Sequence, residues 1–147
     1  MAEGLLKKLL EREGVGLVEV ASAGTMAPVG LPSAGNAVIT MMEKGIDISD
    51  HRAQLLTAEM ADEADLILVM ERAHLRFIES RFPTAKEKTF LLKALGRHDE
   101  AGDIDDPIGG DLELYQNCRD ILEYEIERIL PTILEMSAKK RGYTGFF

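Results

Sequence analysis

The sequence predicts an α/β fold, a doubly wound parallel sheet with helices on both faces in three layers. Three observations lead to this prediction. Residues 65–70 form a continuous apolar run bounded by acidic residues, which is typical of a strand buried on both faces of a parallel sheet. Segments with strand character alternate along the chain with segments of helical periodicity. The 147 residues, 46% of them hydrophobic, suffice for one domain with a sizeable core.

Each element is predicted from the spacing of apolar residues and from the residues that end helices. Gly14 and Gly45 follow amphipathic segments and are expected to end two helices. Thr57 is the expected N-cap of a short helix, and Pro83 ends another. In chain order we predict a helix over 2–13, a strand over 17–23, a helix over 34–42, a helix over 58–63, a strand over 65–70, a helix over 72–81, a strand over 89–92 and a long helix from 112.

The long helix and the end of the chain carry separate expectations. Apolar residues at positions 115, 118, 122, 126, 129 and 133 form one stripe, and Pro131 is expected to kink or end the helix. Residues 1–136 are therefore assigned to one domain. Residues 137–147 form a basic and aromatic tail with weak structure signals. Its last residues, 142–147, are expected to be disordered, with docking on a partner as the alternative.

The order of the predicted elements is unusual, because the chain opens with a helix and only three strands follow. A doubly wound domain normally begins with a strand whose loop leads into the first helix. We therefore expect a sheet that lacks its first, central strand. Its absence would expose unpaired edges on strands 17–23 and 65–70, and a homodimer through those edges is a reasonable expectation.

Composition excludes several functions. The net charge of −9 argues against nucleic-acid binding, which requires a basic face. The single cysteine, Cys118, excludes an intrachain disulfide framework and any multi-cysteine metal site, and it fits a reducing, cytoplasmic setting. The longest apolar runs are too short for a membrane span.

Six segments together resemble the low-molecular-weight protein tyrosine phosphatase family, in the family's order and over roughly residues 1–135. Of these, the Asp106-Pro107 segment stands just before the long helix. The segments are 1–6, 22–25, 45–53, 65–70, 106–110 and the pairs 114–115 and 119–120.

The resemblance implies a two-step phosphoryl transfer through a cysteinyl-phosphate, with no metal or other cofactor and a phosphorylated protein as substrate. It assigns Asp106 as the general acid, held by Pro107, with Asp105 as the alternative. It also assigns His51 and Ser22 to second-sphere hydrogen bonds that brace the phosphate loop. Without the resemblance, Asp106 is a helix-cap or turn acid, His51 an exposed loop histidine and Ser22 an ordinary serine at a strand end.

The nucleophile of the family has no counterpart in this chain. No Cys-x5-Arg loop occurs, and Cys118 lies on the apolar stripe of the long helix, where a packing role is expected. We therefore expect the missing strand and loop to belong before Met1, and the 147 residues to be inactive by themselves. The alternatives are a natural non-catalytic binding domain and a generic doubly wound domain of the receiver type.

The expected substrate is phosphotyrosine by default, or phosphoarginine. Residues 26–33 and 108–110 contain no aromatic side chain, so the rim of the pocket is expected to be aliphatic and open. This pattern resembles bacterial members of the family, including the arginine phosphatases. The arsenate reductases of the family need additional cysteines, which this chain lacks.

Overall fold

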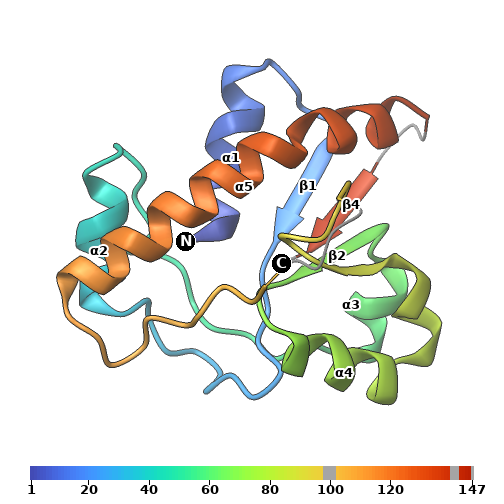
Figure 1. The fold of residues 1–147 in the computed structure, drawn as a ribbon, viewed down its shortest axis with the longest axis horizontal. Coiled ribbons are helices and arrows are strands. Elements are labelled where there is room, and N and C mark those ends of the chain that lie inside the picture. The colour runs from blue at the N-terminus through green and yellow to red at the C-terminus, as the bar shows by residue number, and fades with distance from the viewer. Residues whose placement is uncertain (98–101, 140–142, 147) are drawn as a thin grey trace.

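The computed structural model describes residues 1–97, 102–139 and 143–146, and its elements confirm the predicted α/β class (Figure 1). Helices and strands alternate along most of the chain. The elements are α1 (Ala2–Arg12), β1 (Val18–Ala21), α2 (Gly35–Met42), α3 (Ala58–Glu63), β2 (Leu66–Val69), α4 (Arg72–Arg81), the 3-10 helix η1 (Pro83–Lys88), β3 (Thr89–Leu91), α5 (Leu112–Lys139) and β4 (Tyr143–Phe146).

Local signals place the ends of the shorter helices where the sequence predicts them. The Thr57 hydroxyl accepts a hydrogen bond from the backbone N–H of Met60 at 3.2 Å, which confirms the N-cap of α3. Gly14 and Gly45 follow α1 and α2, each with a φ of 70°. Glycine adopts this left-handed conformation without steric cost, so both helices end there.

The long helix α5 does not end at Pro131, contrary to one of the two expectations for that residue. It continues to Lys139, with Pro131 exposed on its outer side. Proline removes one backbone hydrogen bond from a helix interior. Burial of the neighbouring Leu130 and Ile133 in the core holds the helix on either side of that position.

The sheet differs from the prediction at its centre. Its four strands have the order β1-β4-β2-β3, and all three pairings are parallel. The segment Tyr143–Phe146, expected to be disordered, is β4 and pairs with β1 along its whole length. The expectation that the inner edges of β1 and β2 are exposed is therefore wrong for β1 and for Leu66 and Ile67 of β2, because β4 pairs with them. Residues 140–142 and 147 of the predicted tail lie outside the described residues.

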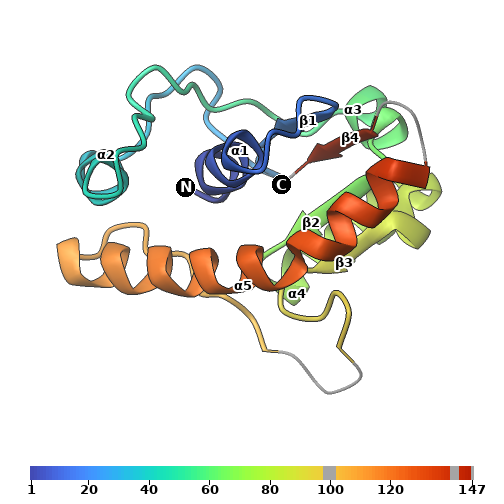
Figure 2. The same ribbon diagram turned by 90° about the horizontal axis from the view of Figure 1, so that it is seen from above.

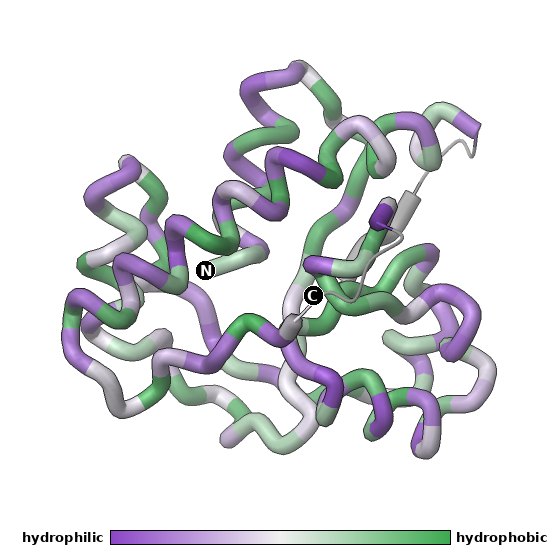
Figure 3. Tube along the Cα trace, viewed as in Figure 1, coloured by the Kyte–Doolittle hydropathy of each residue, from purple (hydrophilic) through white to green (hydrophobic). Residues whose placement is uncertain are grey.

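The sheet separates two hydrophobic cores, and Figure 2 shows the helices and strands around them from a second direction. Leu66 and Leu68 of β2 pack into the larger core with α1 and α5. Ile67 and Val69 point to the opposite face, into a smaller core with α3, α4 and η1. Because both faces of β2 are buried, its sequence is continuously apolar, and this stretch stands out in green among the elements of Figure 3.

Within the parts of the chain that the structure describes, no helix is long and apolar enough to cross a membrane.

Candidate active site

The chemically active side chains gather at the carboxyl edge of the sheet. Ser22 follows β1 directly, and His74 lies in the first turn of α4, just after β2. Asp106 lines two cavities there, of about 240 and about 230 Å³, and His74 lines both as well. In parallel α/β sheets, ligands bind in crevices outside this edge.

The loop that carries Asp106 is anchored at its base. The buried Ile104 donates its backbone N–H to the carbonyl of Met70 at 2.8 Å, immediately after β2. Lys93 donates to the carbonyl of Asp103 at 2.9 Å. The exposed Asp106 carboxylate accepts the backbone N–H of Ile108 at 3.0 Å. This turn contact fixes the carboxylate of Asp106 beside the two cavities, where it can reach a ligand.

Glycines close the same loop onto α5. Gly109 has a φ of 77°, and the N–H of Gly110 donates to the carbonyl of Pro107 at 2.8 Å. The Gly110 carbonyl in turn accepts from the Asn36 side chain of α2 at 3.2 Å. Asp111 then caps α5 by accepting the N–H of Leu114 at 3.0 Å. The turn is therefore held by contacts on both sides of Gly110.

Replacing Gly110 by alanine should open this turn. A β-carbon at Gly110 would lie 2.8 Å from the carbonyl oxygen of Pro107 and 2.7 Å from Cδ1 of Leu114. We expect a loss of about 1–3 kcal/mol in the free energy of unfolding, measured by urea denaturation. Gly16→Ala is the matched control, since a β-carbon there meets no atom within 4 Å. Equal stability of the two variants would contradict the tight contact at Gly110.

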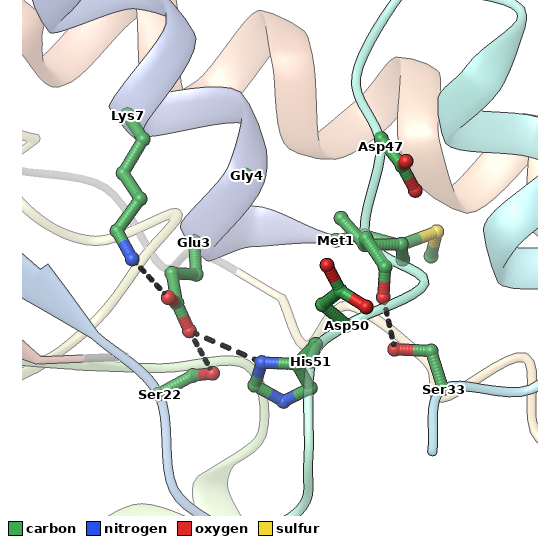
Figure 4. Close-up of a pocket in the computed structure, with 10 residues that line it drawn as sticks. Met1, Glu3, Gly4, Lys7, Ser22, Ser33, Asp47, Asp50 and His51 are labelled. Carbon is green, nitrogen blue, oxygen red and sulfur yellow. Dashed lines mark hydrogen bonds and ion pairs between the residues drawn. The ribbon is translucent and has the colours of Figure 1, made fainter.

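Glu3 connects the two residues predicted to support the phosphate loop (Figure 4). Its carboxylate accepts hydrogen bonds from the Ser22 hydroxyl and from Lys7, one helical turn along α1. Nδ1 of His51 lies 3.7 Å from the same carboxylate. Burial by itself would raise the pKa of Glu3, but the hydrogen bonds from Lys7 and Ser22, with the nearby Lys7 and His51, lower it below its ordinary value. Glu3 therefore stays ionised and holds Ser22 and His51 in place.

The structure thus brings Ser22 and His51 together, and Ser22 also shares a cavity with Asp105, Asp106 and Pro107. Sequence reasoning missed Glu3 and His74. In the sequence, Glu3 is one of several charged residues on an amphipathic helix. Its position in the first turn of α1 is the only signal that sets it apart. His74 could have been found from the rule that parallel strands present their sites at their carboxyl ends.

Cys118 is not placed as a nucleophile. It is 8% exposed on α5, and its thiol contacts the backbone carbonyl of Asp105 at 3.8 Å. Burial, followed by the nearby Asp106, raises the pKa of the Cys118 thiol. A nucleophilic cysteine needs the opposite shift, because the thiolate is the reactive form.

Two further observations describe the surroundings of the site. Met26, Val29 and Ile108 are 87%, 71% and 78% exposed, so the described loops beside the site present aliphatic side chains. Among the residues with described positions, no group of three His, Cys, Asp or Glu side chains could hold a metal ion.

A parallel α/β domain with an aspartate-proline loop at its carboxyl edge fits a class of small phosphate-ester hydrolases. The sequence pattern of the family "Low molecular weight phosphotyrosine protein phosphatase" matches residues 1–141. The chain belongs to this family, whose members are hydrolases that act on phosphoproteins.

Individual relatives support the same assignment. The chain is 42% identical to the protein-arginine-phosphatase of Geobacillus stearothermophilus over 82% of this chain and 80% of the relative. It is 37% identical to the protein-arginine-phosphatase of Bacillus subtilis over 96% and 89%. It is also 37% identical to the probable low molecular weight protein-tyrosine-phosphatase EpsP of Ralstonia solanacearum over 90% and 86%.

The fold agrees with solved structures of such proteins. The YwlE arginine phosphatase from Geobacillus stearothermophilus superposes with a TM-score of 0.83, at 37% identity, over 97% of this chain and 88% of that one. A low molecular weight protein tyrosine phosphatase from T. tengcongensis gives a TM-score of 0.83, at 36% identity, over 89% and 88%.

Proposed function

We propose that this chain provides the general acid and the framework of a protein phosphatase that hydrolyses phosphoarginine, with phosphotyrosine as the second candidate. The observation that carries the proposal is the position of Asp106. It stands at the carboxyl edge of the sheet, lines two cavities there, and shares one of them with Ser22 and His74.

The proposed reaction has two steps. A thiolate attacks phosphorus, the S–P bond forms, and the bond from phosphorus to the substrate nitrogen or oxygen breaks as Asp106 gives its proton to the leaving group. Water then attacks the cysteinyl-phosphate, Asp106 takes the proton of that water, and inorganic phosphate leaves as the thiolate is restored. The ionised Glu3 acts indirectly by holding Ser22 and His51.

The surroundings of the site favour phosphoarginine. The exposed side chains beside the site are the aliphatic Met26, Val29 and Ile108. Unlike aromatic side chains, they cannot stack on the ring of a phosphotyrosine. The exposed Asp105, next to the proposed acid, lies where a guanidinium substituent would be attracted. The arginine phosphatases among the relatives support this choice. Phosphotyrosine remains the second candidate substrate, because the chain is similar to the probable tyrosine phosphatase EpsP.

The nucleophile of this reaction is not among the 147 residues under this proposal. The sequence has one cysteine, and burial and neighbouring carboxylates raise the pKa of that Cys118 thiol. The chain by itself is therefore proposed to be inactive. A non-catalytic binding domain is the alternative, and the placement of Asp106 speaks against it, because binding alone does not require a leaving-group acid.

The direct test measures phosphate release from a phosphoarginine peptide and from para-nitrophenyl phosphate. The unmodified chain and its Cys118→Ser variant should both show no hydrolysis above buffer, since Cys118 stays a protonated, buried thiol. Binding of the phosphoarginine peptide, followed by calorimetry, should exceed binding of the phosphotyrosine peptide. Hydrolysis that disappears in Cys118→Ser would refute the proposed role of Cys118, and tighter phosphotyrosine binding would reverse the order of substrates.

We also propose that the protein is cytoplasmic and that it can form a homodimer. With β4 between β1 and β2, the edges available to a second copy are the outer edges of β1 and β3. A homodimer would therefore form by strand pairing at an outer edge. Light scattering that gives the mass of a single chain at all concentrations would exclude it.

A further inference from the structure

Helix α4 begins beside the candidate active site, and its cap comes from a distant part of the chain. The first four backbone N–H groups of a helix lack partners inside it. Glu71 occupies the N-cap position of α4, but its side chain accepts no hydrogen bond from the described first turn. The N–H of Arg72 donates instead to Oδ1 of Asp103 at 3.1 Å. A residue 31 positions further along the chain therefore caps this helix.

The backbone at Asp103 is fixed in the same region. Its carbonyl accepts a hydrogen bond at 2.9 Å from Nζ of Lys93, which lies in the turn after β3. The next residue, Ile104, is buried and donates its N–H to the carbonyl of Met70 at the end of β2. The loop that carries Asp106 is thus joined at its base to the ends of β2 and β3 and to the start of α4.

The hydrogen bond between Arg72 and Asp103 lies between two side chains of the candidate site. Asp106 follows Asp103 in the same loop, and His74 follows Arg72 in the first turn of α4. Both Asp106 and His74 line the cavities of about 240 and about 230 Å³. The cap therefore connects the loop of Asp106 directly to the helix of His74.

We propose that Asp103 is a positioning residue, which holds the general acid Asp106 beside the two cavities by clamping its loop to α4. A carboxylate suits this place, because the N-terminus of a helix attracts negative charge. The catalytic part of the inference rests on the proposed function, in which Asp106 protonates the leaving group. A general acid works only within hydrogen-bond reach of that group, so a small displacement of the loop slows the reaction.

The first test follows the backbone amides of the 147-residue chain by NMR. Asp103→Ala removes the cap, so the signals of Arg72 and His74 should shift together with that of Ile108, which donates to the Asp106 carboxylate at 3.0 Å. Asp103→Asn keeps an oxygen that can accept the N–H of Arg72, and it should shift these signals less. An unchanged Ile108 signal in Asp103→Ala would overturn the proposal, because the loop would then keep its place without the cap.

A second variant serves should Asp103→Ala unfold. Asp103→Glu keeps the negative charge, but its longer side chain places the carboxylate oxygens at a different distance from the N–H of Arg72. The Arg72 and Ile108 signals should again shift together, and a shift of Arg72 alone would count against the clamp.

Thr57→Ala is the matched control for the loss of a helix cap. The Thr57 hydroxyl accepts the N–H of Met60 at 3.2 Å at the start of α3, outside the loop of Asp106. The urea midpoint should fall about as much in Thr57→Ala as in Asp103→Ala, but the Ile108 signal should stay in place. Equal shifts of that signal in both variants would contradict the proposal, because they would then report lost stability.

The second test measures phosphoarginine hydrolysis by this chain joined after a strand and a Cys-x5-Arg loop placed before Met1. Asp103→Ala should lower kcat about 10–100-fold with KM nearly unchanged, because the substrate still binds while its acid is displaced. Asp103→Asn should retain kcat within about threefold, and Thr57→Ala should retain it fully. The loss in Asp103→Ala should shrink for para-nitrophenyl phosphate, whose leaving group departs without a proton.

A double variant identifies the side chain through which Asp103 acts. Adding Asp103→Ala to Asp106→Asn should slow hydrolysis no further, because the acid that Asp103 holds is already absent. An unchanged kcat in Asp103→Ala, or an undiminished further loss in the double variant, would refute the positioning role. Amide shifts as expected, with no hydrolysis by the joined chain when Asp103 and Asp106 are intact, would support the clamp and overturn the proposed function.

Discussion

Replacing Arg128 by methionine is expected to lower the free energy of unfolding by about 3–5 kcal/mol, because the buried Glu125 keeps only its longer contact to Arg97 and three backbone carbonyls lose their donor. Nε of Arg128 donates to Glu125 at 2.7 Å, and Glu125 is only 4% exposed. The guanidinium also donates to the carbonyls of Leu92, Lys93 and Leu95 at 3.0, 3.2 and 2.6 Å. Arg128 therefore ties α5 to the turn after β3, and urea denaturation measures the loss.

Two variants control this experiment. Arg97→Met removes a single contact to Glu125, at 3.2 Å, and Arg97 is more exposed, so we expect a loss of about 1 kcal/mol. The double variant Glu125→Met with Arg128→Met should be more stable than Arg128→Met, because the buried charge of Glu125 is then removed together with its main partner. A double variant as unstable as the single one would show that lost packing, and not the charge, accounts for the effect.

Replacing Asp106 by asparagine is expected to reduce phosphoarginine hydrolysis about 10²–10⁴-fold when this chain is joined after a strand and a Cys-x5-Arg loop placed before Met1. Asparagine keeps an oxygen that can accept the N–H of Ile108, which the carboxylate accepts at 3.0 Å, so the loop should survive while the proton donor is lost. Turnover at a saturating concentration of the phosphoarginine substrate is the measurement.

Two comparisons make the assignment of the acid specific. Asp105→Asn should retain most of the activity, because Asp105 contacts Cys118 through its backbone carbonyl, which the substitution keeps. The defect of Asp106→Asn should shrink for a nitrophenyl leaving group, which departs without a proton. A larger defect in Asp105→Asn would transfer the role of general acid to that residue.

The sequence predicts correctly those helices and strands whose ends are set by nearby residues. Helix α4 occupies residues 72–81 as predicted, because the break at Pro83 is local. Thr57 caps α3 by a contact three residues away. By contrast, no local signal in residues 143–146 distinguishes a strand from a tail, since β4 is defined by distant backbone groups on β1 and β2.

The same distinction applies to the candidate site. Ser22, His51 and Asp106 belong to sequence segments that resemble the family. All three line the cavities beside the edge of the sheet. Glu3 is different, because its role depends on the folding of residues 22 and 51 against α1. The pattern of α1 predicts its buried leucines but not the partners of its one half-buried carboxylate.

The position of β4 has a consequence for biosynthesis. Val18 leaves the ribosome well before its strand partner, Tyr143. The sheet therefore cannot close until residues 143–146 have been made, and until then the inner edges of β1 and β2 lack a partner. Pairings between such distant segments form slowly, and open edges promote aggregation. In a cell, the yield of this chain should consequently depend on chaperones during and just after translation.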